Sequence, residues 1–236
     1  MIAATGGTPA ALAAKKATKS VPIVFHVATD PVEVGLVARL NRPGGNLTGI
    51  SSLNVGLGPK LVELLHEVVP TATVVAALVN PTNPNSDAVS KDLQAAADAL
   101  GLKLHVLHAS AEHHFDMVFA KLVQLQAGGL VIGADAFFTT QTELIAALAA
   151  RHAVPAIYGI REFAGAGGLM SYAADLTEVY RLVGVYTGRV LKGEKPAELP
   201  VQQVTKVELI INLKAAKALG VSVPLPILGR ADEVIE

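Results

Sequence analysis

The sequence contains no cysteine and no tryptophan, and it is poor in aromatic (4%) and charged (17%) residues. Without cysteine there is no disulfide framework, no thiolate nucleophile and no cysteine-based metal site, so redox chemistry does not indicate a compartment. Lys and Arg number 19 against 20 Asp and Glu, for a net charge of −1. Nucleic acids and anionic membranes both require clustered positive charge. We therefore expect no nucleic-acid partner.

A membrane-spanning run is also missing, although 51% of the 236 residues are apolar. The longest uncharged stretch, Val68–Ser86, is interrupted by Pro70, Pro81 and Pro84, which favours a strand and a loop over a span. The first seven residues lack the basic start and apolar run of a signal peptide. They predict a strand followed by a turn, as if the chain began in the middle of a fold.

Short apolar runs alternate with helical patterns along the whole chain. Strands are predicted at Ile2–Thr5, Val21–Val27, Asn46–Ser51, Thr73–Val79, Lys103–Leu107, Gly129–Ala134, Pro155–Gly159, Leu169–Tyr172 and within Val201–Ile211. Helices are predicted at Thr8–Lys19, after Asp30, and at Leu57–Val68, Ser86–Leu100, Ala111–Gln126, Thr139–His152, Leu176–Leu191 and Leu213–Leu219. This alternation is typical of an α/β fold with right-handed crossovers and parallel, doubly wound sheets.

About nine strands are many for one open sheet of this kind, so we expect two lobes joined by crossing strands. The predicted crossings lie near Ser51–Asn54 and Ile160–Gly168. Lobe 1 then comprises residues 1–53 and 163–198, and lobe 2 comprises residues 54–162 and 199–236. The four strands assigned to lobe 1 include Leu169–Tyr172.

Ligands of open α/β sheets bind beyond the carboxyl ends of the strands, so polar residues that follow strands are the candidates. Gly7, Thr8 and Pro9 form a turn that offers a hydroxyl and helix N–H groups to an anion, or a plain helix cap. Asp30 pairs with a ligand ammonium or caps the next helix. Asn80 lies in a rigid, amide-rich loop that either binds a polar ligand or caps the helix at Ser86.

Three further candidates follow later strands. Asp135 stands beside Phe137 and Phe138, which suits a ligand with one charged and one apolar end, with core packing as the alternative. Tyr158 and Arg161 end the Pro155–Gly159 strand. Arg161 is suited to bidentate carboxylate binding, or it forms a surface pair with Glu162.

Catalytic and metal-binding patterns are poorly represented. His113 and His114 are adjacent, not at the i, i+4 spacing that shares a helix face, and neither a His-Glu-x-x-His nor a Gly-x-Ser-x-Gly motif is present. We expect no enzyme activity, no cofactor and no metal.

Several stretches, taken together and in this order, resemble the bacterial ABC-transporter substrate-binding proteins of the tryptophan or aromatic-amino-acid type. They are GTPAALAAKKATKSVPIVF, DPVEVGLVARLNRPGGNLTGIS, VPAIYGIREFAGAGGLMSYAADL, INLKAAKALG and RADEVIE, and they run from Gly7 to Glu236. The resemblance implies a type I periplasmic-binding-protein fold, with two Rossmann-like lobes around a small molecule. It also implies an extracytoplasmic location and an ABC permease as partner.

The family's ligand-facing loops fall on Gly7-Thr8-Pro9, Asp30, Asn80, Asp135 and the region of Tyr158. From this we expect Thr8 and nearby N–H groups to hold a ligand carboxylate and Asp30 or Asp135 to take an ammonium. Phe137, Phe138 and Tyr158 would supply apolar walls.

The chain departs from the family at its front, where members carry an export signal and two further β-α units. The expectation is a first lobe incomplete at its N-terminus, from a truncated chain, a mis-assigned start, or a natural fragment that forms a homo-oligomer or exchanges strands. Three other readings stay open: a ligand-sensing domain of a regulator or receptor, a fragment no longer competent to bind, and a cleft enzyme such as a racemase or isomerase.

Overall fold

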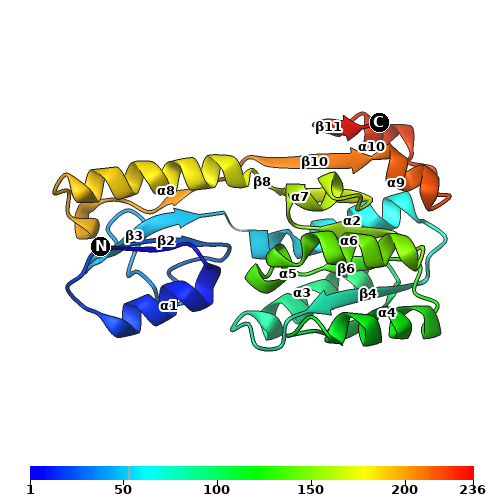
Figure 1. The fold of residues 1–236 in the computed structure, drawn as a ribbon, viewed down its shortest axis with the longest axis horizontal. Helices are drawn as coiled ribbons and strands as arrows, with labels where there is room; N and C mark the ends of the chain where they lie inside the picture. The colour runs from blue at the N-terminus through cyan, green and yellow to red at the C-terminus, as the bar shows by residue number, and fades with distance from the viewer. Residues whose placement is uncertain (53) are drawn as a thin grey trace. The chain divides into compact units, whose positions relative to one another are not determined.

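The computed structural model describes residues 1–52 and 54–236, which divide into two compact units. Unit 1 comprises Met1–Val55 and Ala174–Lys206, and unit 2 comprises Gly56–Ala173 and Val207–Glu236 (Figure 1). The sequence placed the divisions after residues 53, 162 and 198. Among the described residues, no helix is both long and apolar enough to cross a lipid bilayer.

Unit 1 is built on a four-stranded sheet in the order β1-β2-β3-β9, with parallel pairing throughout. Its strands are β1 (Ile2–Ala4), β2 (Ile23–Val27), β3 (Leu47–Ser51) and β9 (Gln202–Gln203). Its helical elements are α1 (Gly7–Ala17), α8 (Leu176–Leu191) and the 3₁₀ turn η2 (Pro196–Glu198), while the 3₁₀ turn η1 (Asn54–Leu57) spans the boundary between the units.

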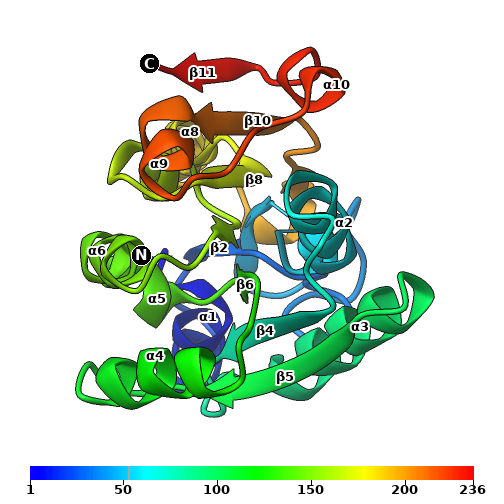
Figure 2. The same cartoon turned by 90° about the vertical axis from the view of Figure 1, so that its right-hand side faces the viewer.

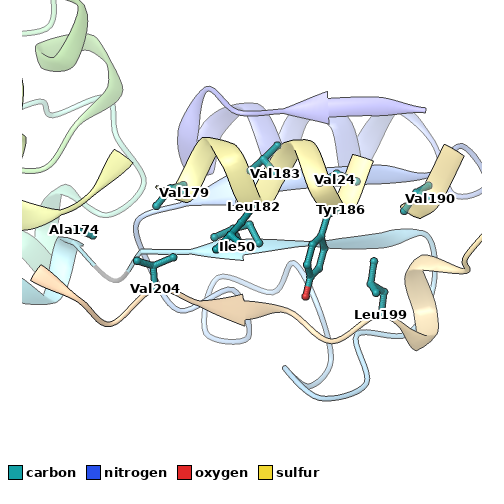
Figure 3. Packing of buried hydrophobic residues seen from close by; sticks show 10 residues of the cluster. All are labelled: Val24, Ile50, Ala174, Val179, Leu182, Val183, Tyr186, Val190, Leu199 and Val204. Atoms are coloured by element: carbon teal, nitrogen blue, oxygen red, sulfur yellow. The ribbon is translucent and has the colours of Figure 1, made fainter. Parts of the chain in front are cut away.

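The side chains of β2 point alternately to the two faces of its sheet, and the core of unit 1 therefore has two layers. Phe25 and Val27 pack on the side of Ala11 of α1, whereas Val24 packs with residues of α8. Figure 3 shows the second layer, in which Leu182 and Tyr186 of α8 lie over Ile50 of β3. Both faces of β2 and β3 are therefore buried, as expected for parallel strands.

Unit 2 holds a seven-stranded sheet in the order β11-β10-β8-β7-β6-β4-β5. Figure 2 shows β11, β10, β8, β6, β4 and β5 in this succession. The strands are β4 (Val74–Val79), β5 (Lys103–His108), β6 (Leu130–Ile132), β7 (Ala156–Tyr158), β8 (Met170–Ala174), β10 (Val207–Asn212) and β11 (Glu233–Ile235). From β5 to β8 every neighbouring pair is parallel, and β10 pairs in parallel with β11.

The helices of unit 2 fill the connections between its strands. They are α2 (Gly58–Val68), α3 (Ser86–Ala99), α4 (His114–Gln124), α5 (Ala136–Thr140), α6 (Thr142–Arg151), α7 (Arg161–Gly165), α9 (Leu213–Ala218) and α10 (Leu225–Leu228). The segment predicted as one helix, Thr139–His152, forms two helices in the structure. The helix is interrupted at Gln141, which lies between α5 and α6.

Two expectations about strands and helices are wrong. The strand predicted at Leu169–Tyr172 is β8, which pairs with β7 in unit 2, and the fourth strand of the other sheet is β9. The segment after Asp30 is a series of turns, not a helix, because Gly35 adopts φ +69° and stops helical propagation.

Candidate functional site

Polar side chains gather where β1, β2 and β3 of unit 1 end. The hydroxyl groups of Thr8 and Thr29 lie 3.2 Å apart, and both residues are more than nine-tenths buried. Ser51 donates its hydroxyl proton to the carbonyl oxygen of Thr29 at 2.8 Å. These contacts fix the Thr8–Thr29 pair at the first turn of α1.

The N-terminus of α1 is left without a side-chain cap. Gly6 occupies the N-cap position, and the first turn contains no acidic residue. The first backbone N–H groups of a helix lack intrahelical acceptors and carry partial positive charge. Together with the Thr8 hydroxyl they form a surface suited to a carboxylate.

Asp30 caps the turn that follows β2. Its Oδ1 accepts from the backbone N–H of Val32 at 2.7 Å and of Glu33 at 3.4 Å. The side chain is partly exposed. Asp30 therefore closes a turn and caps no helix, while its second carboxylate oxygen accepts no hydrogen bond from the described residues.

His26 was missed by the sequence reasoning, although it lies within the buried run of β2. Its Nε2 lies 3.2 Å from the hydroxyl of Ser52, and its ring meets Tyr180 edge-on at 5.8 Å. Burial lowers the pKa of His26 to about 4, so the ring is neutral at pH 7. Its Nδ1 is buried without a partner among the described residues.

Asp135 is the centre of the polar cluster in unit 2. Its Oδ1 accepts from the backbone N–H groups of Phe137 (2.8 Å) and Phe138 (3.4 Å), which caps α5. The same oxygen accepts from Asn80 Nδ2 at 3.1 Å, and Oδ2 accepts from Asn83 Nδ2 at 2.6 Å. The carboxylate is therefore already occupied by four donors.

Asn80 and Asn83 belong to the loop between β4 and α3. Asn80 Oδ1 accepts from the backbone N–H and the hydroxyl of Thr82, at 3.0 and 2.8 Å. Asn83 Oδ1 accepts from the backbone N–H of Asn85 at 2.9 Å. Asn80 was a sequence candidate, whereas Asn83 was not singled out.

The predicted aromatic walls divide into one surface ring and two core rings. Phe137 is partly exposed and stacks on Phe115, with ring centres 5.7 Å apart. Phe138 and Tyr158 are fully buried. Burial raises the pKa of the Tyr158 phenol, which donates to the Asp135 carbonyl oxygen at 3.1 Å. The structure thus assigns Phe138 and Tyr158 to the core beneath the cluster.

Arg161 does not join the cluster. Its guanidinium forms an ion pair with Glu208 at 3.5 Å and a second one with Glu233. Both of these partners lie on neighbouring strands, β10 and β11. These contacts anchor the C-terminal strand to the start of α7.

Among the described residues, unit 2 contains a small pocket and a larger groove. A small pocket of about 10 Å³ is lined by Val79, Asn80, Asn83, Ser86, Val89, Gly133, Ala134 and Asp135. That volume is at the lower limit for one water molecule. A groove of about 690 Å³ is lined by Thr139, Thr140, Gln141, Thr142, Glu143, Leu144, Glu162, Gly165 and Ala166, none of which was a sequence candidate. Within residues 1–52 and 54–236, no group of three His, Asp or Glu side chains is placed to hold a metal ion.

Comparisons with known proteins point to one family. A family model described as "ABC transporter substrate binding protein" matches residues 1–235. A tyrosine-binding protein of Clostridioides difficile is 28% identical over 213 residues, which cover 90% of this chain and 61% of the relative. The chain therefore spans about three fifths of the length of that curated relative.

Two solved structures extend the comparison to the fold. One is an ABC domain from Streptococcus pneumoniae in complex with L-Trp, with 27% identity and a TM-score of 0.85 over 99% of this chain and 77% of the other. The second is a conserved domain protein from Vibrio cholerae, with 28% identity and a TM-score of 0.86 over 99% and 76%.

Proposed function

Because the chain belongs to the ABC transporter substrate-binding protein family, we propose that it captures an aromatic amino acid for an ABC importer. The observation that carries this proposal is the match of the family model to residues 1–235. Relatives described as binding tyrosine and as complexed with L-Trp support the aromatic class. The family consists of binding proteins, and its type I periplasmic-binding-protein fold matches the two α/β units described above.

In this proposal the α-carboxylate of the ligand binds at the uncapped N-terminus of α1, beside Gly7, Thr8 and Pro9. Asp30 follows the neighbouring strand β2, and its carboxylate oxygen that accepts no hydrogen bond from the described residues takes the α-ammonium. Asp135 is less suited to the ammonium because its oxygens already accept four hydrogen bonds. Unit 1 would therefore recognise the amino-acid group and unit 2 the remainder of the ligand.

The same proposal includes a setting and partners. The chain would act outside the cytoplasmic membrane, bind its ligand in a cleft between the two units by hinge closure, and deliver it to a permease. The homo-oligomer expected from the sequence stays a prediction. Since β1 is an edge strand of its sheet, light scattering on the purified chain is the direct test.

Calorimetric titration of the chain with L-tyrosine, L-tryptophan, L-phenylalanine and L-alanine tests the function. We expect the aromatic ligands to bind and L-alanine to bind at least about tenfold more weakly, because it buries no ring. Absence of heat and of a thermal shift with all three aromatic ligands would contradict the proposal.

Thr8→Val tests the carboxylate position with little change of shape. Loss of one hydrogen bond to a charged group predicts affinity for L-tyrosine lower by about tenfold or more. Thr177→Val is the matched control, since Thr177 also occupies the second position of a helix but is exposed. An equal effect of the two substitutions would remove Thr8 from the site.

A further inference from the structure

The loop between β4 and α3 owes its conformation to the carboxylate of Asp135. A carboxylate only accepts hydrogen bonds, so the amide nitrogens of Asn80 and Asn83, and not their oxygens, must face it. The side-chain oxygens of both residues are turned to Thr82 and Asn85. The orientation of each amide is thus fixed at both ends.

This arrangement leaves unused N–H donors on both amides of the cluster. Each amide nitrogen carries two protons and uses one of them on Asp135. Among the described residues, no acceptor takes the second proton of either amide. The two side chains also line the pocket of about 10 Å³, which has room for a single oxygen-sized atom.

Resting on the proposed function, we propose that this pocket receives one hydrogen-bond acceptor oxygen of the ligand and that Asp135 is the positioning residue for it. Asp135 acts through Asn80 and Asn83, whose remaining N–H groups meet the ligand oxygen. The amide nitrogens of Asn80 and Asn83 line this pocket together with the side chains of Ser86 and Asp135, and their second protons suit an acceptor oxygen. The class of ligand is therefore an aromatic compound with an exposed oxygen acceptor.

The neighbouring Phe137 indicates which part of the ligand approaches. Its partly exposed ring follows Asp135 by two residues and is held by stacking on Phe115. The proposal places the aromatic ring of the ligand against Phe137, with an oxygen on that ring directed toward the amides. A phenolic oxygen fits this description, and a carboxylate oxygen is the other source of the same chemistry.

Asp135→Asn separates the positioning role from the helix cap. Asparagine caps helices as well as aspartate does, so α5 keeps its N-cap. The new amide, however, presents N–H in place of Oδ2 to Asn83, and two donors cannot pair. Asp175→Asn is the matched control, because Asp175 caps α8 through the same pair of distances, 2.8 and 3.4 Å, without an asparagine partner.

The test measures dissociation constants of wild type and both variants for L-tyrosine, L-phenylalanine and L-tyrosinamide. If a phenolic oxygen enters the pocket, wild type binds L-tyrosine about tenfold or more tightly than L-phenylalanine. If a carboxylate oxygen enters, the same preference appears over L-tyrosinamide and persists in Thr8→Val, whereas a carboxylate held at α1 gives a preference that falls in Thr8→Val. With either oxygen in the pocket, Asp135→Asn reduces the preference to about twofold, while Asp175→Asn retains it.

A loss of stability alone would lower affinity for all three ligands together and leave their ratios unchanged, which would overturn the positioning role. Wild type that binds L-tyrosine, L-phenylalanine and L-tyrosinamide equally would overturn the acceptor pocket and the carboxylate position at α1, while leaving the capture of an aromatic amino acid intact. Wild type that binds no aromatic amino acid would contradict the proposed function itself.

Gly133→Ala provides a second, purely steric variant. A Cβ at this position would lie 3.1 Å from the carbonyl oxygen of Leu78 and 3.4 Å from Val89, which narrows the pocket. We expect the preference for the oxygen-bearing ligand to fall here as well, with every amide still in place. A preference that survives in both Gly133→Ala and Asp135→Asn would refute the pocket as an oxygen site.

Discussion

Among single residues, the buried histidine of unit 1 couples stability to pH. The pKa of His26 is lowered to about 4 by burial, whereas an unfolded chain takes up the proton near its ordinary value of 6.5. The neutral His26 ring therefore makes its full contribution to the free energy of unfolding above pH 6.5, and this contribution is lost as the pH falls toward 4. Across that window the loss amounts to about 3 kcal/mol.

Urea unfolding of wild type, His26→Gln and His108→Gln between pH 4 and 8 measures this coupling. His26→Gln should lose most of the decline in the free energy of unfolding below pH 6.5. His108→Gln, at an exposed position, should follow wild type. Parallel profiles for wild type and His26→Gln would show that His26 is protonated in the folded chain.

Residue positions could be predicted from the sequence better than residue roles. Asp30, Asn80 and Asp135 were found because each follows a strand, and the structure places polar clusters there. The hydrogen bonds that Asp135 accepts from the amides of Asn80 and Asn83 could not be predicted, because the loop that carries these amides lies more than fifty residues away in the sequence. Tyr158 and Phe138 were expected as walls because the sequence shows where an aromatic residue lies but not which way it faces.

Within the elements, helices were predicted more accurately than strand partners. Leu176–Leu191 has the bounds observed for α8, since Asp175 caps its start and a buried stripe continues to Val190. β8 was assigned to the wrong sheet, because an apolar run indicates burial and not the identity of its neighbours. β9 is two residues long and carries no pattern of its own.

Adding one methyl group is expected to change stability in opposite directions at two glycines, one in a strand and one in a helix. A Cβ at Gly49 of β3 would lie 2.2 Å from the carbonyl oxygen of Phe25, its partner on β2. We expect Gly49→Ala to lower the free energy of unfolding by about 2 kcal/mol or more. At Gly184 of α8 the same methyl meets open space, so Gly184→Ala should raise stability by about 0.5–1 kcal/mol.

Chemical denaturation of both variants, with circular dichroism as the signal, checks this contrast. If Gly49→Ala yields no soluble folded protein while Gly184→Ala folds well, the result would agree with the expected loss of stability at Gly49. Stability of Gly49→Ala within about 0.5 kcal/mol of wild type would contradict the close approach of β2 and β3 at this point.

For the whole molecule, the division into two units with separate cores predicts unequal local stability. Unit 2 is larger and contains a seven-stranded sheet, whereas the sheet of unit 1 has four strands, one of them two residues long. The fraction of surface buried on folding rises with size, so unit 1 has the smaller reserve of stabilising burial. Local unfolding should therefore begin in unit 1.

Hydrogen exchange followed by mass spectrometry resolves this difference along the chain. Peptides from β2 and β3 should exchange roughly tenfold or more faster than peptides from β4 and β6, which lie inside the larger sheet. Saturating L-tyrosine should slow exchange in unit 1 most, because a ligand that binds only folded units stabilises both and the weaker one limits opening. Equal exchange of the two sheets without ligand would mean that the units unfold as one cooperative body.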